Sequence, residues 1–287
     1  MRALISGYPL RLLLEASGLP KSTWHDRQKR DSQPQKVEPL AELIVERTAR
    51  HNRCYGYRRM TLELRAHGQT VNHKKVARLM RELGCQARVR RKKYRSWQGK
   101  AEMAASSNLL NRDFSAERPG TKLVTDVTEF RVGREKLYLS PVIDLYNREV
   151  VAMSMATRPA YALTERMQAS LLLHSEYTLR GAILHSDQGW QYRMRPWRKV
   201  LDAHGVRQSM SRRGNCLDNA VMESFFAVLK TEVYHGQHYK SVEELETAIT
   251  EYVHYYNHER IKAGLGGVSP VNYRTLHHPQ SLNPVQV

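Results

Sequence analysis

Three acidic residues, Asp126, Asp187 and Glu223, are of the type, and sit in the sequence contexts, that metal-dependent phosphoryl transfer favours. Sixty residues separate the two aspartates, and thirty-five separate Asp187 from Glu223. Two divalent ions about 3.5–4 Å apart need hard oxygen ligands that converge from different elements and leave positions open for phosphate oxygens. Two strand-borne aspartates and one helix-borne glutamate can supply that arrangement.

Different predicted elements must position these three carboxylates. Asp126 lies inside KLVTDVTEFRV, where apolar and polar residues partly alternate, so we expect a strand. Asp187 ends the apolar run GAILHSD and is followed by QGWQY, which places it where a strand runs out into a loop. Glu223 lies in DNAVMESFFAVLKTE, which predicts a helix.

The predicted helix around Glu223 carries a second candidate residue, Lys230. Seven residues are close to two helical turns, so Glu223 and Lys230 are expected to share a face. Either Asp218 or Asn219 can cap the start of this helix. An ammonium group on this face is placed to meet a substrate phosphate.

Four neighbouring polar residues are further candidates for the site. Glu129 follows Asp126 by three positions and is expected on the opposite face of the same strand. Asp144 ends the next predicted strand, where a turn role is commoner than a ligand role. His185 and Gln191 flank Asp187 and are expected to contact substrate or to position the loop.

The charge of the chain indicates a polyanionic partner. The formal net charge is +18, and the pI is about 10.0. Residues 1–100 hold 24 Lys and Arg against 8 Asp and Glu, while the other 187 residues hold 22 against 20. This asymmetry favours a basic nucleic-acid-binding arm joined to a nearly neutral working domain, although a solvated basic surface is the alternative.

Composition places the chain among globular proteins that lack membrane spans. At 287 residues and 41% apolar content it can bury one sizeable core plus small domains. No apolar run approaches the roughly 18–20 residues of a membrane span. Arg11 and Glu15 interrupt the apolar N-terminus, so no signal peptide is expected. Three widely spaced cysteines imply no disulfide framework, and a cytoplasmic location is expected.

A structural zinc site is the alternative use of the histidines and cysteines in the basic region. Four such side chains could close a tetrahedral site, but no CxxC or HxxxH pair is present, so no zinc is expected. The residues concerned are His51, Cys54, His67, His73 and Cys85.

The basic region predicts two helix-turn-helix modules, at residues 1–35 and 36–95. In the first, Gly18 ends a short apolar helix, and a second helix follows Pro20 with Ser22 as a possible N-cap. A further helix is expected from about Leu40 to His51. In the second module, YGYRRMTLELRAHG and NHKKVARLMRELG form the pair, with Asn72 as cap. A purely packing role for this pair is the alternative.

The remaining segments predict the domain order. RVRRKKYR, residues 88–95, is a basic arm that suits a phosphate backbone. Residues 96–118 are expected to be a linker. Residues 119–275 show strands followed by alternating helices and strands, which predicts an α/β fold with a mixed sheet flanked by helices. Residues 276–287 form a tail.

The ordered motifs VTDVTEF, LHSDQGWQY and NCLDNAVMESFFAVLKTE strongly resemble those of the DDE transposases of bacterial insertion sequences. The closest likeness is to the second-frame product, OrfB, of elements that fuse two reading frames by frameshifting. The resemblance spans nearly the whole chain and includes YGYRRMTLEL, NHKKVARLM and YYNHERIKAGLGGVSPVNY. It implies a ribonuclease-H-like fold shared with retroviral integrases. It also implies a catalytic triad of Asp126, Asp187 and Glu223, a basic residue at Lys230, and two Mg²⁺ or Mn²⁺ ions per active site.

The resemblance further implies DNA nicking and strand transfer at insertion-sequence ends. The expected partners are double-stranded DNA, as terminal inverted repeats and as target, and a first-frame product, OrfA. A homo-oligomer on DNA is also expected. A catalytically inert DNA-binding regulator and a non-joining ribonuclease-H-like nuclease are the alternatives. The residues expected to contact DNA are Lys21, Arg27, Lys74, Lys75, Arg78, Arg90, Arg91, Lys92, Lys93, Arg212, Arg213 and Lys230.

Overall fold

The computed structural model describes residues 7–32, 39–88, 107–173, 179–212 and 216–278. The chain divides into two compact units, Met1–Val45 and Glu46–Val287, and each is described by itself. No helix in these described ranges is long and apolar enough to cross a membrane.

The first unit contains the helix pair predicted near the N-terminus. Helix α1 spans Leu10–Ser17 and ends at Gly18, which adopts φ 64°. Helix α2 spans Lys21–Ser32. The predicted N-cap at Ser22 is wrong, because the helix has already begun at Lys21 and the Pro20 carbonyl accepts from the Trp24 N–H at 3.1 Å. Helix α3, Pro39–Arg50, starts within a residue of its predicted position.

The second helix pair follows the sequence prediction closely. Helix α4 spans Tyr57–Ala66 and helix α5 spans His73–Glu82. The Asn72 side chain caps α5 by accepting from the Lys74 N–H at 2.8 Å. The basic side chains of α5 are exposed, because the apolar residues of both helices are the ones that pack inward. The buried apolar residues are Met60, Leu64, Val76, Leu79 and Met80.

Six strands of the described residues form one mixed sheet in the order β2-β3-β1-β5-β6, with β4 also paired to β3. Strand β3 is antiparallel to β1, β2 and β4, whereas β1, β5 and β6 are parallel. This confirms the predicted mixed sheet. The strands are β1 Lys122–Thr125, β2 Thr128–Val132, β3 Glu135–Asp144, β4 Val150–Ala156, β5 Ile183–Ser186 and β6 Arg207–Met210.

The prediction of one continuous strand through Asp126 is wrong, because the run is interrupted between β1 and β2. Thr125 pairs with Val142 and Thr128 pairs with Leu139, so both strands keep one register along β3. That register sets Asp126 opposite Pro141, which has no N–H to donate to a ladder. The interruption frees the backbone at Asp126 from the sheet.

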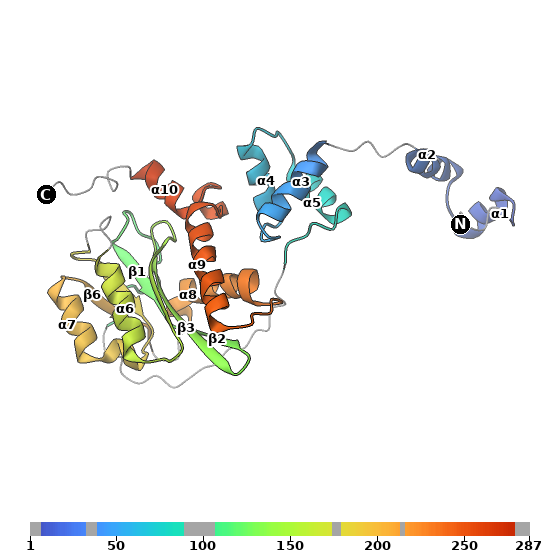
Figure 1. The fold of residues 1–287 in the computed structure, drawn as a ribbon. Helices are drawn as coiled ribbons and strands as arrows, with labels where there is room; N and C mark the ends of the chain where they lie inside the picture. The colour runs from blue at the N-terminus through green and yellow to red at the C-terminus, as the bar shows by residue number, and fades with distance from the viewer. Residues whose placement is uncertain (1–6, 33–38, 89–106, 174–178, 213–215, 279–287) are drawn as a thin grey trace. The chain divides into compact units, whose positions relative to one another are not determined.

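Helices cover both faces of the sheet (Figure 1). Leu123 and Val124 are adjacent in β1 and point to opposite faces. Leu123 joins a core with helices α6, Tyr161–Leu172, and α7, Arg195–Ala203. Val124 joins a second core with helices α8, Ala220–Leu229, and α9, Val242–His258. Both faces of the sheet are therefore buried.

The chain after α8 departs from the sequence prediction in two places. The helix predicted to continue through Glu232 changes at Lys230 into a π-helical turn, Lys230–Tyr234, labelled η4. A helix that was not predicted, α10, Pro270–His277, crosses the predicted start of the tail at residue 276. Pro270 occupies the first turn of α10, and the Ser269 side chain caps it by accepting from the Asn272 N–H.

Candidate active site

Asp126 and Asp187 lie directly after two adjacent parallel strands. Leu123 pairs with Leu184 and Val124 pairs with His185, so the same register sets Asp126 beside Asp187. The carboxyl ends of parallel strands meet at one edge of a sheet, which is where α/β proteins commonly place their ligands. The sheet therefore brings together two residues that sixty positions separate.

Two hydrogen bonds hold the Asp126 carboxylate. Its Oδ1 accepts from the Val127 N–H at 2.7 Å, and its Oδ2 accepts from Asn219 Nδ2 at 3.1 Å. Burial, together with the negative charges of Asp187 and Glu223, raises the pKa of Asp126 to about 7. Asp126 is thus close enough to both other carboxylates for their charges to repel its own.

Asp187 is fixed by the turn that follows β5. Its Oδ1 accepts from the Gly189 N–H at 2.9 Å, and burial raises its pKa. A Cβ on Gly189 would lie 2.9 Å from Asp187 Oδ1 and 2.8 Å from Gln191 Nε2. A side chain at position 189 would therefore displace the Gln191 amide or the Asp187 carboxylate, and Gln191 lies beside Asp187.

Glu223 lies in the first turn of α8 and is exposed, and partial desolvation raises its pKa. Asn219 precedes the helix at the predicted cap position, but its side chain makes no cap hydrogen bond and instead donates to Asp126. Lys230 ends α8, and its Nζ lies 5.2 Å from the centre of the Phe130 ring. The α8 segment thus contacts Asp126 through Asn219 at its start and β2 through Lys230 at its end.

The donor set of this cluster fits a hard divalent cation. All three side chains present carboxylate oxygens, the ligands that Mg²⁺ prefers. A cation would also relieve the mutual repulsion that raises the pKa of Asp126. In the part of the chain that the structure describes, no three His, Cys, Asp or Glu side chains are gathered tightly enough to hold a metal ion.

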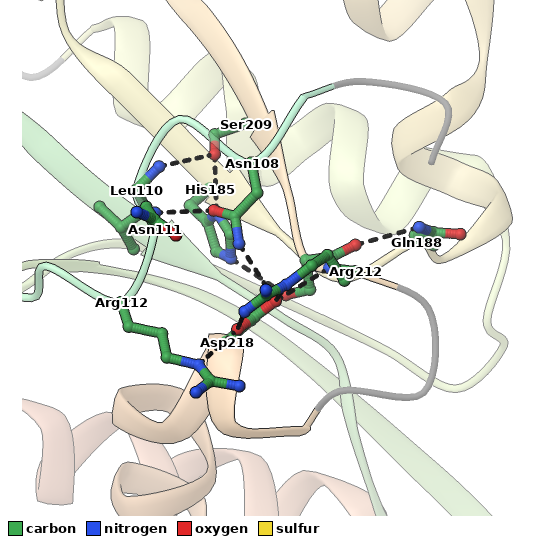
Figure 2. A network of polar contacts seen from close by, with 10 residues as sticks. Asn108, Leu110, Asn111, Arg112, His185, Gln188, Ser209, Arg212 and Asp218 are labelled. Atoms are coloured by element: carbon green, nitrogen blue, oxygen red, sulfur yellow. Dashed lines mark hydrogen bonds and ion pairs between the residues drawn. The ribbon is translucent and has the colours of Figure 1, made fainter. Parts of the chain in front are cut away.

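A buried polar network lies next to the carboxylates (Figure 2). Its centre is the Asp218 side chain, which is 0% exposed and accepts from Arg212 Nε and Nη2, both at 2.9 Å. Arg112 Nε, at 2.9 Å, and Asn108 Nδ2, at 3.1 Å, also donate to it. The arginines lower the pKa of Asp218. Asp218 therefore joins residues 108–112 to the chain that leads into α8.

His185 belongs to this network and does not reach substrate. It is fully buried, with Nδ1 2.8 Å from Ser209 Oγ and Nε2 3.0 Å from Ser211 Oγ. The Ser209 hydroxyl also accepts from the Leu109 and Leu110 N–H groups. Burial lowers the pKa of His185 to about 4, so the ring is neutral at pH 7. These partners lie on β6 and directly after it, so neither predicted role, substrate contact or positioning of the loop after Asp187, is observed directly.

We expect Asp218→Asn to reduce stability at neutral pH, by roughly 1–3 kcal/mol, because hydrogen bonds between charged groups are lost. The folded-state pKa of Asp218 is lowered, so its contribution is fully present above the ordinary pKa of 3.8 and is lost as pH falls through the folded value. Thermal melting at pH 7 and below pH 3.8 should show the difference shrinking in acid. An equal difference at both pH values would contradict this role.

The two other carboxylates weighed from the sequence have structural partners. Glu129 accepts from Lys136 Nζ at 2.9 Å on the exposed edge of β2, so it does not join the cluster. Its orientation is as predicted, but it belongs to a separate strand from Asp126. Asp144 is 0% exposed and accepts from the Gly120 and Tyr146 N–H groups, which is the predicted turn role.

The predicted DNA contacts are distributed over both units. Lys21 is exposed at the start of α2, and Arg27 lies within that helix. Lys74, Lys75 and Arg78 are exposed on α5, where Arg78 also pairs with Glu82 at 3.1 Å. Arg212 is committed to Asp218. The predictions for Arg90, Arg91, Lys92, Lys93 and Arg213 lie outside the described residues.

Comparison with known proteins identifies the family. An integrase core domain model matches residues 116–216, a second model of the same description matches 223–277, and an HTH-like domain model matches 35–93. The chain is 47% identical to InsK of insertion sequence element IS150 from Escherichia coli, named as a transposase, over 93% of this chain and 94% of that protein. It is 36% identical to the transposase InsF of insertion sequence IS3A, over 88% of each. The chain belongs to the IS3 family of insertion-sequence transposases.

This family assignment and the integrase core match confirm the predicted ribonuclease-H-like class for the mixed sheet and its helices. Among solved structures, a simian T-cell lymphotropic virus intasome aligns with 81% of this transposase and 74% of that chain. The TM-score is 0.46 and the identity is 16%, and this similarity concerns the fold alone.

Sequence reasoning missed the residues that position the site. Asn219 and Asp218 were predicted only as helix caps, yet they bond to Asp126 and to two arginines. Arg112 and Asn108 lie within the predicted linker, and nothing in their local pattern marks them. The sequence signal that could have found them is that Asp218 and Asn219 stand together directly before the Glu223 helix. Two such side chains have more hydrogen-bonding groups than one helix cap uses.

Proposed function

We propose that Asp126, Asp187 and Glu223 are the catalytic residues of this transposase and that they hold two Mg²⁺ or Mn²⁺ ions. The observation that supports this most is the half-buried Asp126 carboxylate beside Asp187, whose pKa is raised by burial and then by the charges of the other two acids. These three carboxylates concentrate negative charge at the end of a strand, in a transposase with a DNA-binding HTH-like domain. Such a site suits metal-dependent phosphoryl transfer. When bound, the ions activate a water or a 3′-hydroxyl and stabilise the departing oxygen.

The protein's own residues then have separate tasks. The two aspartates are held at the sheet edge by the Val127 and Gly189 N–H groups, so their oxygens are oriented before DNA arrives. Glu223 comes from a helix tied to β1 through Asn219. Lys230 supplies positive charge for a DNA phosphate from the end of the same helix. No covalent link between protein and DNA is needed.

We further propose the partners and the division of labour. Helices α1–α5 and the following basic arm bind the terminal inverted repeats, and the core acts on element ends and target DNA. The domain limits remain 1–35, 36–95, 96–118, 119–275 and 276–287, with residues 107–112 of the linker bonded to the core. A homo-oligomer on DNA, a first-frame partner OrfA and a cytoplasmic location complete the proposal.

An end-processing assay tests this function. Purified protein is mixed with duplexes that carry the terminal repeats of its own element, with Mg²⁺, with Mn²⁺ or with EDTA. We expect nicked and then joined strands only with a divalent ion. Binding without cleavage would indicate an inert regulator, and cleavage that never yields joined strands would indicate a nuclease.

Lys230→Ala is expected to reduce strand joining by at least about tenfold if the ammonium group meets a DNA phosphate. Lys230→Arg should retain much of the activity, since it keeps the charge but changes the geometry of the donor. Joining should be measured at low and moderate salt, because phosphate contacts weaken as salt rises.

The control for Lys230 must be chosen from the structure. The position of Glu232 in the predicted helix, two residues after Lys230, favours Glu232→Ala as the control, but the Glu232 side chain is 9% exposed and pairs with Arg260, so that choice is wrong. Lys240→Ala, at an exposed lysine before α9, is the suitable control. Equal activity of Lys230→Ala, Lys240→Ala and wild type at both salt levels would leave Lys230 without a DNA role.

A further inference from the structure

A cavity of about 690 Å³ lies on a different side of α8 from the carboxylates. Helix α8 contributes Ala220, Ser224 and Val228 to its wall, whereas Asp126, Asp187 and Glu223 do not line it. The other walls come from α4, from the turn between β3 and β4, and from the end of α9 with the 3₁₀ turn after it, Ala263–Leu265. The volume falls within the range of small-molecule sites.

Four cationic side chains line this cavity: Arg59, Arg148, Arg260 and Lys262. Among the described lining residues there is no Asp or Glu. Glu232, from behind the wall, pairs with Arg260 through contacts of 2.5 and 2.7 Å and offsets that one charge. The cavity therefore keeps an excess of positive charge.

Within the described residues, the hydrogen bonds of the other three cations go to neutral oxygen atoms. Arg148 Nη2 donates to the Phe114 carbonyl at 3.0 Å, while its buried Nη1 finds no hydrogen-bond partner in the part of the chain that the structure describes. Arg59 Nη1 donates weakly to the Cys54 carbonyl at 3.5 Å. Lys262 Nζ donates to Tyr256 Oη at 2.5 Å. The three side chains are half-buried, and removing a cation from water is costly unless an anion pairs with it, so an anion in the cavity would stabilise this wall.

The electrostatics of Lys262 agree with that reading. Burial, and after it the charges of Arg260, Arg148 and Arg59, lower the pKa of Lys262 to about 7. Its ammonium group lies 4.2 Å from the centre of the Tyr256 ring, which substitutes only weakly for an anion. An anion in the cavity would restore the ordinary charge of Lys262 and satisfy the buried Arg148 nitrogen.

The residues that line the cavity also suit an aromatic group, such as a nucleic-acid base, attached to the anion. Aromatic rings line the cavity beside the cations, and bases stack on such rings without regard to sequence. Arginine and lysine together match phosphate better than most other anions. The rings concerned are Phe114, Tyr146, Tyr256 and Tyr273.

We propose that this cavity is a second nucleic-acid site, which binds a backbone phosphate of a DNA strand together with its attached nucleoside. It lies behind the helix that carries Glu223, so the bound strand is distinct from the one at the carboxylates. Helix α8 then lies between two binding sites for DNA strands, one at the carboxylates and one at the cavity. The inference uses no catalytic step and stands whether or not the carboxylates hold metal.

Binding to the full chain tests the proposal with three probes: inorganic phosphate, thymidine 5′-monophosphate and a short oligothymidylate. We expect saturable binding of the nucleotide, tighter than that of phosphate, with the oligothymidylate competing for the same site. The double variant Arg59→Gln/Lys262→Gln should weaken nucleotide binding by at least about tenfold, since two charge-assisted contacts are lost. The control Arg195→Gln/Lys199→Gln removes the same charge from exposed residues of α7 and should leave binding unchanged.

A second variant guards against misfolding. A Cβ on Gly264 meets nothing within 4 Å, so Gly264→Asp adds an acid to the lining without a clash and should also abolish nucleotide binding. Its control is Lys199→Gln, which changes the net charge equally. Equal binding by wild type, Gly264→Asp and the double variant would overturn the proposal. Phosphate binding with which the oligothymidylate does not compete would overturn the DNA assignment.

Discussion

Asp126→Asn, Asp187→Asn and Glu223→Gln are each expected to abolish DNA nicking and strand joining, lowering the rates at least roughly 10³-fold. Each change removes one anionic ligand and almost preserves the side-chain shape. Binding to element ends should remain nearly intact, since helices α1–α5 are unchanged. A gel assay of cleavage and joining, paired with a binding assay on the same duplex, checks both expectations.

The melting temperature of each variant is the control for this first prediction, because it shows whether the variant folds. The pKa of Asp126 is raised, so its charged form destabilises the metal-free fold once pH exceeds the ordinary pKa of 3.8, with the full cost reached above about 7. Asp126→Asn should therefore melt at the same temperature as wild type or higher in EDTA at pH 8. Asp202→Asn, at an exposed position of α7, should keep full activity. Substantial Mg²⁺-dependent activity in two of the three triad variants would refute the site.

Glu232→Ala is expected to cause the largest loss of stability, about 3–5 kcal/mol, because it leaves a buried guanidinium without its partner. Arg260 is 2% exposed and Glu232 is 9% exposed, and two nitrogens of Arg260 contact both oxygens of Glu232. The Tyr252 hydroxyl donates to the same carboxylate at 2.8 Å. Chemical denaturation of the full chain measures the effect.

The matched control for this second prediction is the neighbouring surface pair. Glu259 lies 3.3 Å from Arg50, and the two side chains are 45% and 54% exposed. Glu259→Ala should therefore cost at most about 1 kcal/mol. Similar losses for Glu232→Ala and Glu259→Ala would show that burial of the Arg260 pair contributes little.

The sequence was sufficient for features that depend on local pattern. The end of β5 at Asp187 follows from an apolar run meeting a polar turn, and the helix at Glu223 follows from its apolar spacing. The cap at Asn72 and the helix end at Gly18 follow from the chemistry of single residues. These features place Asp187 and Glu223 correctly, whereas Asp126 lies between β1 and β2 and not inside a strand.

The sequence was not sufficient for features set by distant partners. The interruption at Asp126 depends on Pro141, which faces it only after β3 has paired with β1. Asp218 looked like a helix cap because Arg112 lies 106 residues away in the chain. Glu232 looked like a surface residue because Arg260 comes from the far end of α9. The spacing of apolar residues predicts which face of a helix or strand is buried. It does not predict which polar side chains form hydrogen bonds or ion pairs with each other.

The measurement that tests the central claim most directly is anomalous scattering from manganese. Crystals of the protein bound to element-end DNA would be grown with Mn²⁺, and the anomalous difference map would be calculated at the carboxylate cluster. The proposed mechanism predicts two peaks about 3.5–4 Å apart, ligated together by Asp126, Asp187 and Glu223. Manganese bound elsewhere, with these three carboxylates free of metal beside the scissile phosphate, would contradict it.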